Sequence, residues 1–149
     1  MRQRSIGFFI YSSGILFLLT GGAKLISGIG TARILNNPDP VFLISFRHIL
    51  YVAAVAELSV AAICLLSKNR KLQAGLIALL ASNFLLYRFG LYWLGYHSTC
   101  PCLGNLTDTL HIPPQTADTA MKTILGYLLI GSYATLFWLW KEKRKQLPS

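Results

Sequence analysis

Four long apolar segments constrain the fold of this chain more than any other feature of its sequence. They lie near residues 6–26, 49–66, 72–95 and 123–140. Each can cross a hydrocarbon core of about 30 Å, which takes roughly 20 helical residues. Strands of a membrane barrel would alternate polar and apolar residues, and stretches such as 76–86 do not. The sequence therefore predicts an all-α integral membrane four-helix bundle, with one domain over residues 1–149.

The basic residues predict how these spans are oriented. Nine of the 14 Lys and Arg residues lie before the first span, between the second and third, or after the fourth: Arg2, Arg4, Lys68, Arg70, Lys71, Lys141, Lys143, Arg144 and Lys145. The positive-inside rule then places both termini in the cytoplasm and the two long loops outside. The net charge of +9 is explained by this orientation rather than by nucleic-acid binding. A signal peptide over the first span is an alternative that leaves the third-to-fourth loop outside.

Two further patterns concern packing and turns. Gly7, Gly14, Gly21 and Gly28 recur every seventh residue, which predicts a seam where the first helix approaches a neighbour closely. Pro113-Pro114 predicts an extended turn ahead of the fourth span.

The loop after the third span carries Cys100-Pro101-Cys102. On the outward side these thiols can oxidise, and a disulfide closed over one residue would be strained and easily reduced, which favours redox exchange. His97, three residues before Cys100, can act as a base for a thiol. Chelation of a soft metal by the two thiols with His97 or His111 is an alternative, and an inert role is another. Cys64 is predicted at the inner end of the second span as a small buried side chain.

Ionisable residues inside the spans are a separate clue, because charge in hydrocarbon is costly unless it is paired or functional. Glu57 falls near mid-membrane, with Lys24 about 5 Å and Arg88 about 10 Å below the outer surface. We expect these three to form an ion pair or triad, and Arg47 to add a charge at the outer rim. Such a network is either structural neutralisation or a cationic pocket that favours a thiolate and can hold an anionic quinol.

Three groups of residues together resemble the MauE branch of the DoxX-like superfamily over roughly residues 6–140. They are Gly21-Gly22-Ala23-Lys24-Leu25, Glu57 with the basic turn at 68–71, and Cys100-Pro101-Cys102-Leu103-Gly104. The resemblance implies a bacterial inner-membrane protein linked to periplasmic disulfide formation or electron transfer, with a thioredoxin-like partner. In that branch the implied role is maturation of the disulfide-rich subunit of methylamine dehydrogenase. Related DoxX and DoxD proteins imply a quinone as the cofactor to consider.

The resemblance assigns redox roles to Cys100 and Cys102 and leaves Lys24 and Glu57 as matching positions without a role. Quinone-linked membrane oxidants of other families use two cysteine pairs, whereas this chain has one outward pair. That pair either serves both partners in turn or depends on a second protein. Whether the chain is itself a thiol-disulfide oxidoreductase stays open, beside the alternatives of a metal-delivery protein and of a structural membrane subunit.

Overall fold

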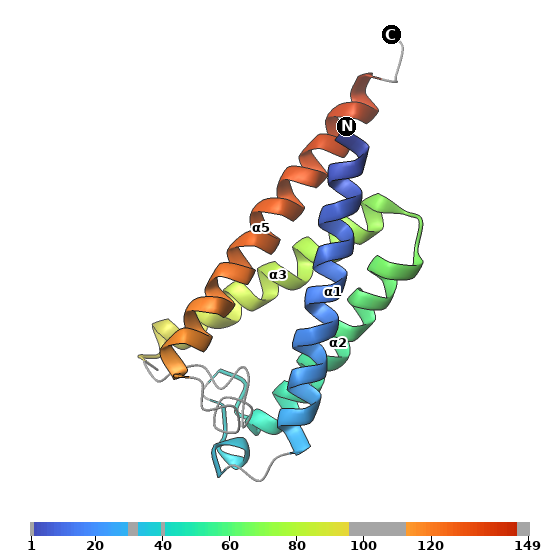
Figure 1. Cartoon of the computed structure of the whole chain (residues 1–149). Helices are drawn as coiled ribbons and strands as arrows, with labels where there is room; N and C mark the ends of the chain where they lie inside the picture. The colour runs from blue at the N-terminus through green and yellow to red at the C-terminus, as the bar shows by residue number, and fades with distance from the viewer. Residues whose placement is uncertain (1, 30–32, 40, 96–112, 146–149) are drawn as a thin grey trace.

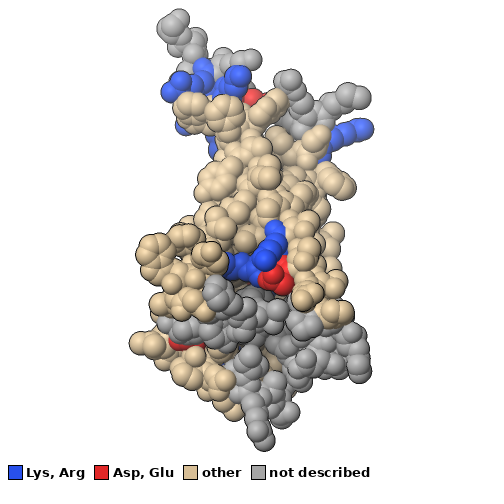
Figure 2. Space-filling model, turned by 90° about the vertical axis from the view of Figure 1, so that its left-hand side faces the viewer, with Lys and Arg blue, Asp and Glu red and all other residues tan. Residues whose placement is uncertain are grey.

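The computed structural model describes residues 2–29, 33–39, 41–95 and 113–145, and these residues confirm the all-α prediction. The order is α1 (Arg2–Ile29), a short 3-10 helix η1 (Arg33–Asn36), α2 (Phe46–Leu66), α3 (Arg70–Trp93) and α5 (Pro114–Lys145). All four long helices are long and apolar enough to cross a membrane. Both ends of the chain and the α2–α3 turn lie at the same end of the bundle (Figure 1). Figure 2 shows basic side chains at that end, above a broad band without charge.

Every long helix extends past at least one of its predicted boundaries, and α5 differs most. It begins nine residues before the predicted 123, at the second proline of the pair that had suggested an extended turn. Proline is favourable at the first helical position, where its missing N–H has no intrahelical partner to lose. The Pro113 carbonyl accepts a hydrogen bond from Thr116 N at 2.9 Å, which closes the first turn.

The α1–α2 contact confirms the predicted glycine seam at three of its four positions. A Cβ added at Gly14 would lie 3.1 Å from Cys64 Cβ, and one at Gly21 would lie 3.0 Å from Leu58. At Gly28 the added atom would lie 2.8 Å from the Tyr51 ring. The fourth position, Gly7, faces only the end of the Arg70 side chain. The absent side chains therefore let α1 lie directly against α2.

The α2–α3 turn is held by a buried glutamine. Gln73 Nε2 donates to the carbonyl oxygens of Ile63, Cys64 and Ser67, at 3.3, 3.0 and 2.7 Å. Ile63 and Cys64 lie in the last turn of α2 and Ser67 is its C-cap, a place where helix carbonyls lack their usual partners. The Ile63 carbonyl also accepts a hydrogen bond from Ser67 N at 3.0 Å. Asn69 accepts a hydrogen bond from Leu72 N and caps the start of α3. The two helices are thus fixed together at this end.

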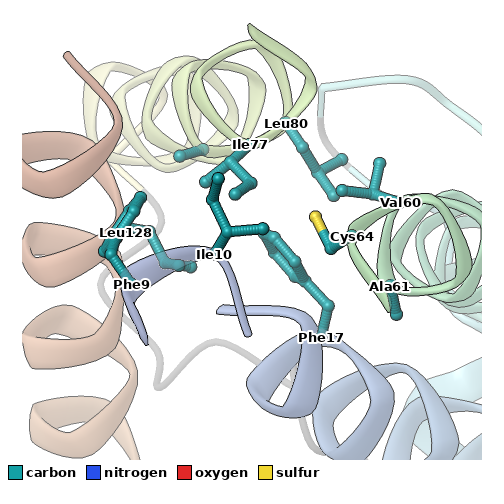
Figure 3. Close-up of a cluster of buried hydrophobic side chains, with 10 residues drawn as sticks. Phe9, Ile10, Phe17, Val60, Ala61, Cys64, Ile77, Leu80 and Leu128 are labelled. Carbon is teal, nitrogen blue, oxygen red and sulfur yellow. The ribbon is translucent and has the colours of Figure 1, made fainter. Parts of the chain in front are cut away.

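The apolar core lies in the half of the bundle that holds the termini. Figure 3 shows its side chains converging from all four helices, with the Cys64 sulfur among them. The core residues are Phe9, Ile10, Phe17, Val60, Ala61, Cys64, Ile77, Leu80, Ala81 and Leu128. The prediction for Cys64 is confirmed, since it is a buried free thiol. Beyond this core, α2 and α3 diverge toward the other end of the bundle (Figure 1).

Candidate functional site

A buried ion pair joins α1 to α2 just beyond the core. Lys24 Nζ donates to Glu57 Oε1 at 2.6 Å, and the two residues are only 4% and 2% exposed. The ammonium also lies 5.5 Å from the centre of the Phe84 ring on α3. Lys24 is therefore turned into the bundle and does not extend along the lipid surface. The pair predicted from the sequence is present.

The predicted triad is not formed, because Arg88 has a different partner. Its Nη2 donates to Asp118 Oδ1, and Lys122 Nζ lies 2.7 Å from Asp118 Oδ2. Asp118 had been expected in a loop, but α5 begins early enough to place it one helical turn inside the helix. The Arg88–Asp118 contact therefore connects α3 to α5, while Lys24–Glu57 connects α1 to α2.

Arg47, the fourth charge of the predicted network, lies in the first turn of α2 and is half-buried. It is not among the described residues that line the cavity beside the ion pair. The structure thus brings Lys24, Glu57 and Arg88 to one cavity and leaves Arg47 outside its lining.

That cavity has a volume of about 650 Å³ and is bounded by all four long helices and the loop before α2. Its walls are mainly apolar and aromatic, and its polar points are few. The aromatic rings come from Phe17, Phe42, Phe46, Phe84 and Tyr87, and the polar side chains from Thr20, Lys24, Glu57, Asn83 and Arg88. A large apolar pocket with a few convergent polar groups is the usual form of a small-molecule site.

The cavity opens sideways between α2 and α3. Val52 on α2 and Leu86 on α3 line it and are also 68% and 66% exposed, so they form its rim. Both positions lie inside candidate membrane spans. A molecule dissolved in the bilayer can therefore reach the cavity without passing through water.

The part of the cavity wall formed by the loop before α2 is held by a buried carboxylate that the sequence did not single out. Asp39 Oδ1 accepts hydrogen bonds from Val41 N at 2.7 Å and Phe42 N at 2.9 Å, and its Oδ2 accepts one from the Tyr87 hydroxyl. The Phe42 ring stacks on Tyr87 with centroids 5.8 Å apart. These contacts fasten the loop to α3 at Tyr87, six residues before the end of that helix.

Cys100, Cys102, His97 and His111 lie outside the described residues. The chain enters their segment after Gly95, two residues beyond the end of α3, and leaves it at Pro113, just before α5. Within the described part of the chain, no group of three or more His, Cys, Asp or Glu side chains is placed to hold a metal ion.

No family model, curated protein or solved structure matches the chain. The class that the described residues define is a multi-pass α-helical membrane protein with a laterally open cavity and a buried ion pair on its wall.

Proposed function

We propose that this chain is a redox-associated membrane protein whose Cys100–Cys102 pair exchanges electrons with a thioredoxin-like protein outside the membrane. The observation that carries the proposal is the cavity with buried charge at the end of the bundle where the cysteine segment joins α3 and α5. Arg88 lies seven residues before Gly95, where the chain enters that segment, and Met121 lies eight residues after Pro113, where the chain leaves it. Both residues line the cavity. The resemblance to the MauE branch supports the same assignment.

The proposed reaction is a balanced two-electron exchange. One thiolate of the pair attacks the disulfide of the partner and forms a mixed disulfide, while a partner thiol leaves. The second cysteine then attacks the mixed disulfide, so the pair becomes oxidised and the partner leaves as a dithiol. In the reverse direction, a Cys100–Cys102 disulfide oxidises a partner dithiol. Disulfide formation in the partner requires this reverse direction and, for each turnover, a separate acceptor that reoxidises the pair.

The proposed location is a bacterial inner membrane with the cysteine segment on the periplasmic side. The grouping of the basic side chains at the end with both termini supports this orientation. The finer proposal, from the resemblance alone, is maturation of the disulfide-rich subunit of methylamine dehydrogenase. Membrane lipid is the second proposed partner and would cover the large apolar side chains that each long helix exposes.

Alkylation with a mass-tagged maleimide tests the exchange. In a Cys64→Ser background, we expect two tags after reduction and none after oxidation with a thioredoxin-like disulfide protein. Cys100→Ser or Cys102→Ser alone should trap a mixed disulfide that a reductant releases. Two free thiols under both conditions would contradict the proposal.

Two further measurements address the alternatives. Copper or zinc bound to the purified protein at one ion per chain would favour the metal-delivery alternative. An unchanged phenotype after replacing both cysteines would favour a structural subunit.

A further inference from the structure

We propose that the cavity between α2 and α3 holds one acyl chain of an acidic glycerophospholipid, with the lipid phosphate on Arg88 and an ester carbonyl on Asn83. This is a defined lipid site, unlike the lipid that covers any membrane span. It uses neither cysteine of the thiol exchange, so it stands or fails separately from the proposed function.

The donor for the phosphate is the unused side of the Arg88 guanidinium. Its Nη2 binds Asp118, whereas its Nη1 is buried and has no hydrogen-bond partner among the described residues. Lys122 binds the same carboxylate, so two positive charges share one negative charge. The Lys24–Glu57 pair neutralises itself and adds no net charge. Guanidinium groups suit phosphate oxygens, and a phosphate on Nη1 would satisfy the buried donor and balance the excess charge.

The partner for the ester is an amide at the mouth of the cavity. Asn83 lines the cavity and is exposed, and it lies three residues, or about one helical turn, before Leu86 on the rim. This position is inside the candidate span Arg70–Trp93, where a polar side chain is costly and often marks a ligand pathway. The amide group of Asn83 has two hydrogens to donate. An ester carbonyl supplies an acceptor that hydrocarbon lacks.

The polar groups and the apolar wall follow the order of the parts of a lipid. Arg88 lies five residues after Asn83, about 7.5 Å further along α3 toward the end of the bundle away from the termini. On the other side, toward the core, the wall is apolar and includes Phe17, Leu80 and Leu128. The head group, the ester and the acyl chain of a glycerophospholipid succeed one another in the same order.

The size and the opening of the cavity narrow the choice of ligand. Its volume of about 650 Å³ lies in the range of about 300–1,000 Å³ that is usual for sites enclosing one small ligand. The rim at Val52 and Leu86 opens toward lipid, so a second acyl chain can stay in the bilayer. A free fatty acid has no ester for Asn83, and a diacylglycerol has no charge for Arg88. An acidic glycerophospholipid provides both.

Photo-crosslinking tests the inference, with the full chain in phosphatidylcholine nanodiscs and a phosphatidylglycerol probe that carries a diazirine on one acyl chain. We expect saturable crosslinks to peptides that line the cavity. Unlabelled phosphatidylglycerol should displace the probe about tenfold to a hundredfold better than diacylglycerol, the effect of a hydrogen bond to a charged group. The dialkyl ether of phosphatidylglycerol lacks the ester carbonyls and should compete about twofold to tenfold less well. Glycerol phosphate, which has no chain, should not compete.

Two variants assign these differences to residues. Asn83→Leu should abolish the difference between the ester and ether lipids. Arg88→Gln should reduce the difference between phosphatidylglycerol and diacylglycerol to a few-fold. Because Arg88→Gln also loses its contact with Asp118, its melting temperature is measured beside that of the parent chain. The series of competing lipids in the parent chain is decisive even if this variant does not fold.

Ala53→Phe fills the cavity without changing a polar residue and should lower crosslinking at least tenfold. The matched control is Ala62→Phe, on an exposed position of the same helix that does not line the cavity, and it should be labelled as the parent chain is. Absence of saturable crosslinking, or equal labelling of the two phenylalanine variants, overturns the inference. Equal competition by diacylglycerol also overturns it, since it would identify a general groove for acyl chains. Competition by glycerol phosphate would identify a soluble phosphate as the ligand instead.

Discussion

Lys24 and Glu57 lie 33 residues apart in the sequence and 2.6 Å apart in the bundle, with both side chains almost fully buried. Burying either charge alone would cost several kcal/mol, roughly, in lost hydration, and the attraction between the two charges offsets part of that cost. The pair sits where the packed core ends and the cavity begins, so it links the stability of the fold to the candidate site.

Lys24→Met should destabilise the protein by about 3–5 kcal/mol, because it leaves Glu57 buried without its counter-charge. Glu57→Gln alone should cost a similar amount, whereas the double variant should cost less than the sum of the two. Thermal unfolding of the purified protein in detergent measures all three. Additive losses would show that the two charges do not stabilise each other.

Gly131→Ala should separate α5 from α1. The added Cβ would lie 2.1 Å from the Phe9 ring, a distance that requires the ring or the helix to move. Overpacking of this kind costs about 1–3 kcal/mol. Gly126→Ala on the same helix is the matched control, since a Cβ there meets nothing within 4 Å. The expected result is a lower melting temperature for Gly131→Ala only, partly restored by adding Phe9→Leu.

Tyr87→Phe should loosen the loop over the cavity while keeping the ring stacked on Phe42. The change removes the hydroxyl that donates to Asp39 Oδ2 and leaves a buried carboxylate oxygen unpaired, at a cost of about 1–3 kcal/mol. Hydrogen exchange at the amides of Val41 and Phe42, both bonded to the same carboxylate, should become faster. Tyr133→Phe is the control, because its hydroxyl meets Ser82 on an exposed surface. Equal exchange in both variants would mean that Asp39 holds the loop without Tyr87.

The sequence predicted the parts of this structure that depend on local composition. Apolar length located four spans, and the cost of charge in hydrocarbon predicted that Lys24 and Glu57 would pair. Arg88 was assigned the wrong partner because the start of α5 was placed after Asp118, and a helix boundary depends on end effects such as the proline at its first position. A charged pocket was one of two interpretations of Lys24, Glu57 and Arg88, but the size and lateral opening of the cavity could not be predicted, since they arise from the divergence of α2 and α3 beyond the turn that Gln73 holds. That divergence is a tertiary property with no local signature.

The predicted orientation can be tested with single cysteines at the two ends of the bundle. In a chain whose native cysteines are replaced by serine, Gln115→Cys marks the start of α5 and Lys71→Cys marks the start of α3, and both positions are exposed. They lie at opposite ends, because α5 starts at the end away from the termini and α3 starts beside them. A membrane-impermeant maleimide should label Gln115→Cys in intact cells and Lys71→Cys only after the membrane is opened, since the basic turn is expected to stay in the cytoplasm. The reverse pattern would place the segment that carries Cys100 and Cys102 in a reducing compartment, where a stable disulfide between them is not expected.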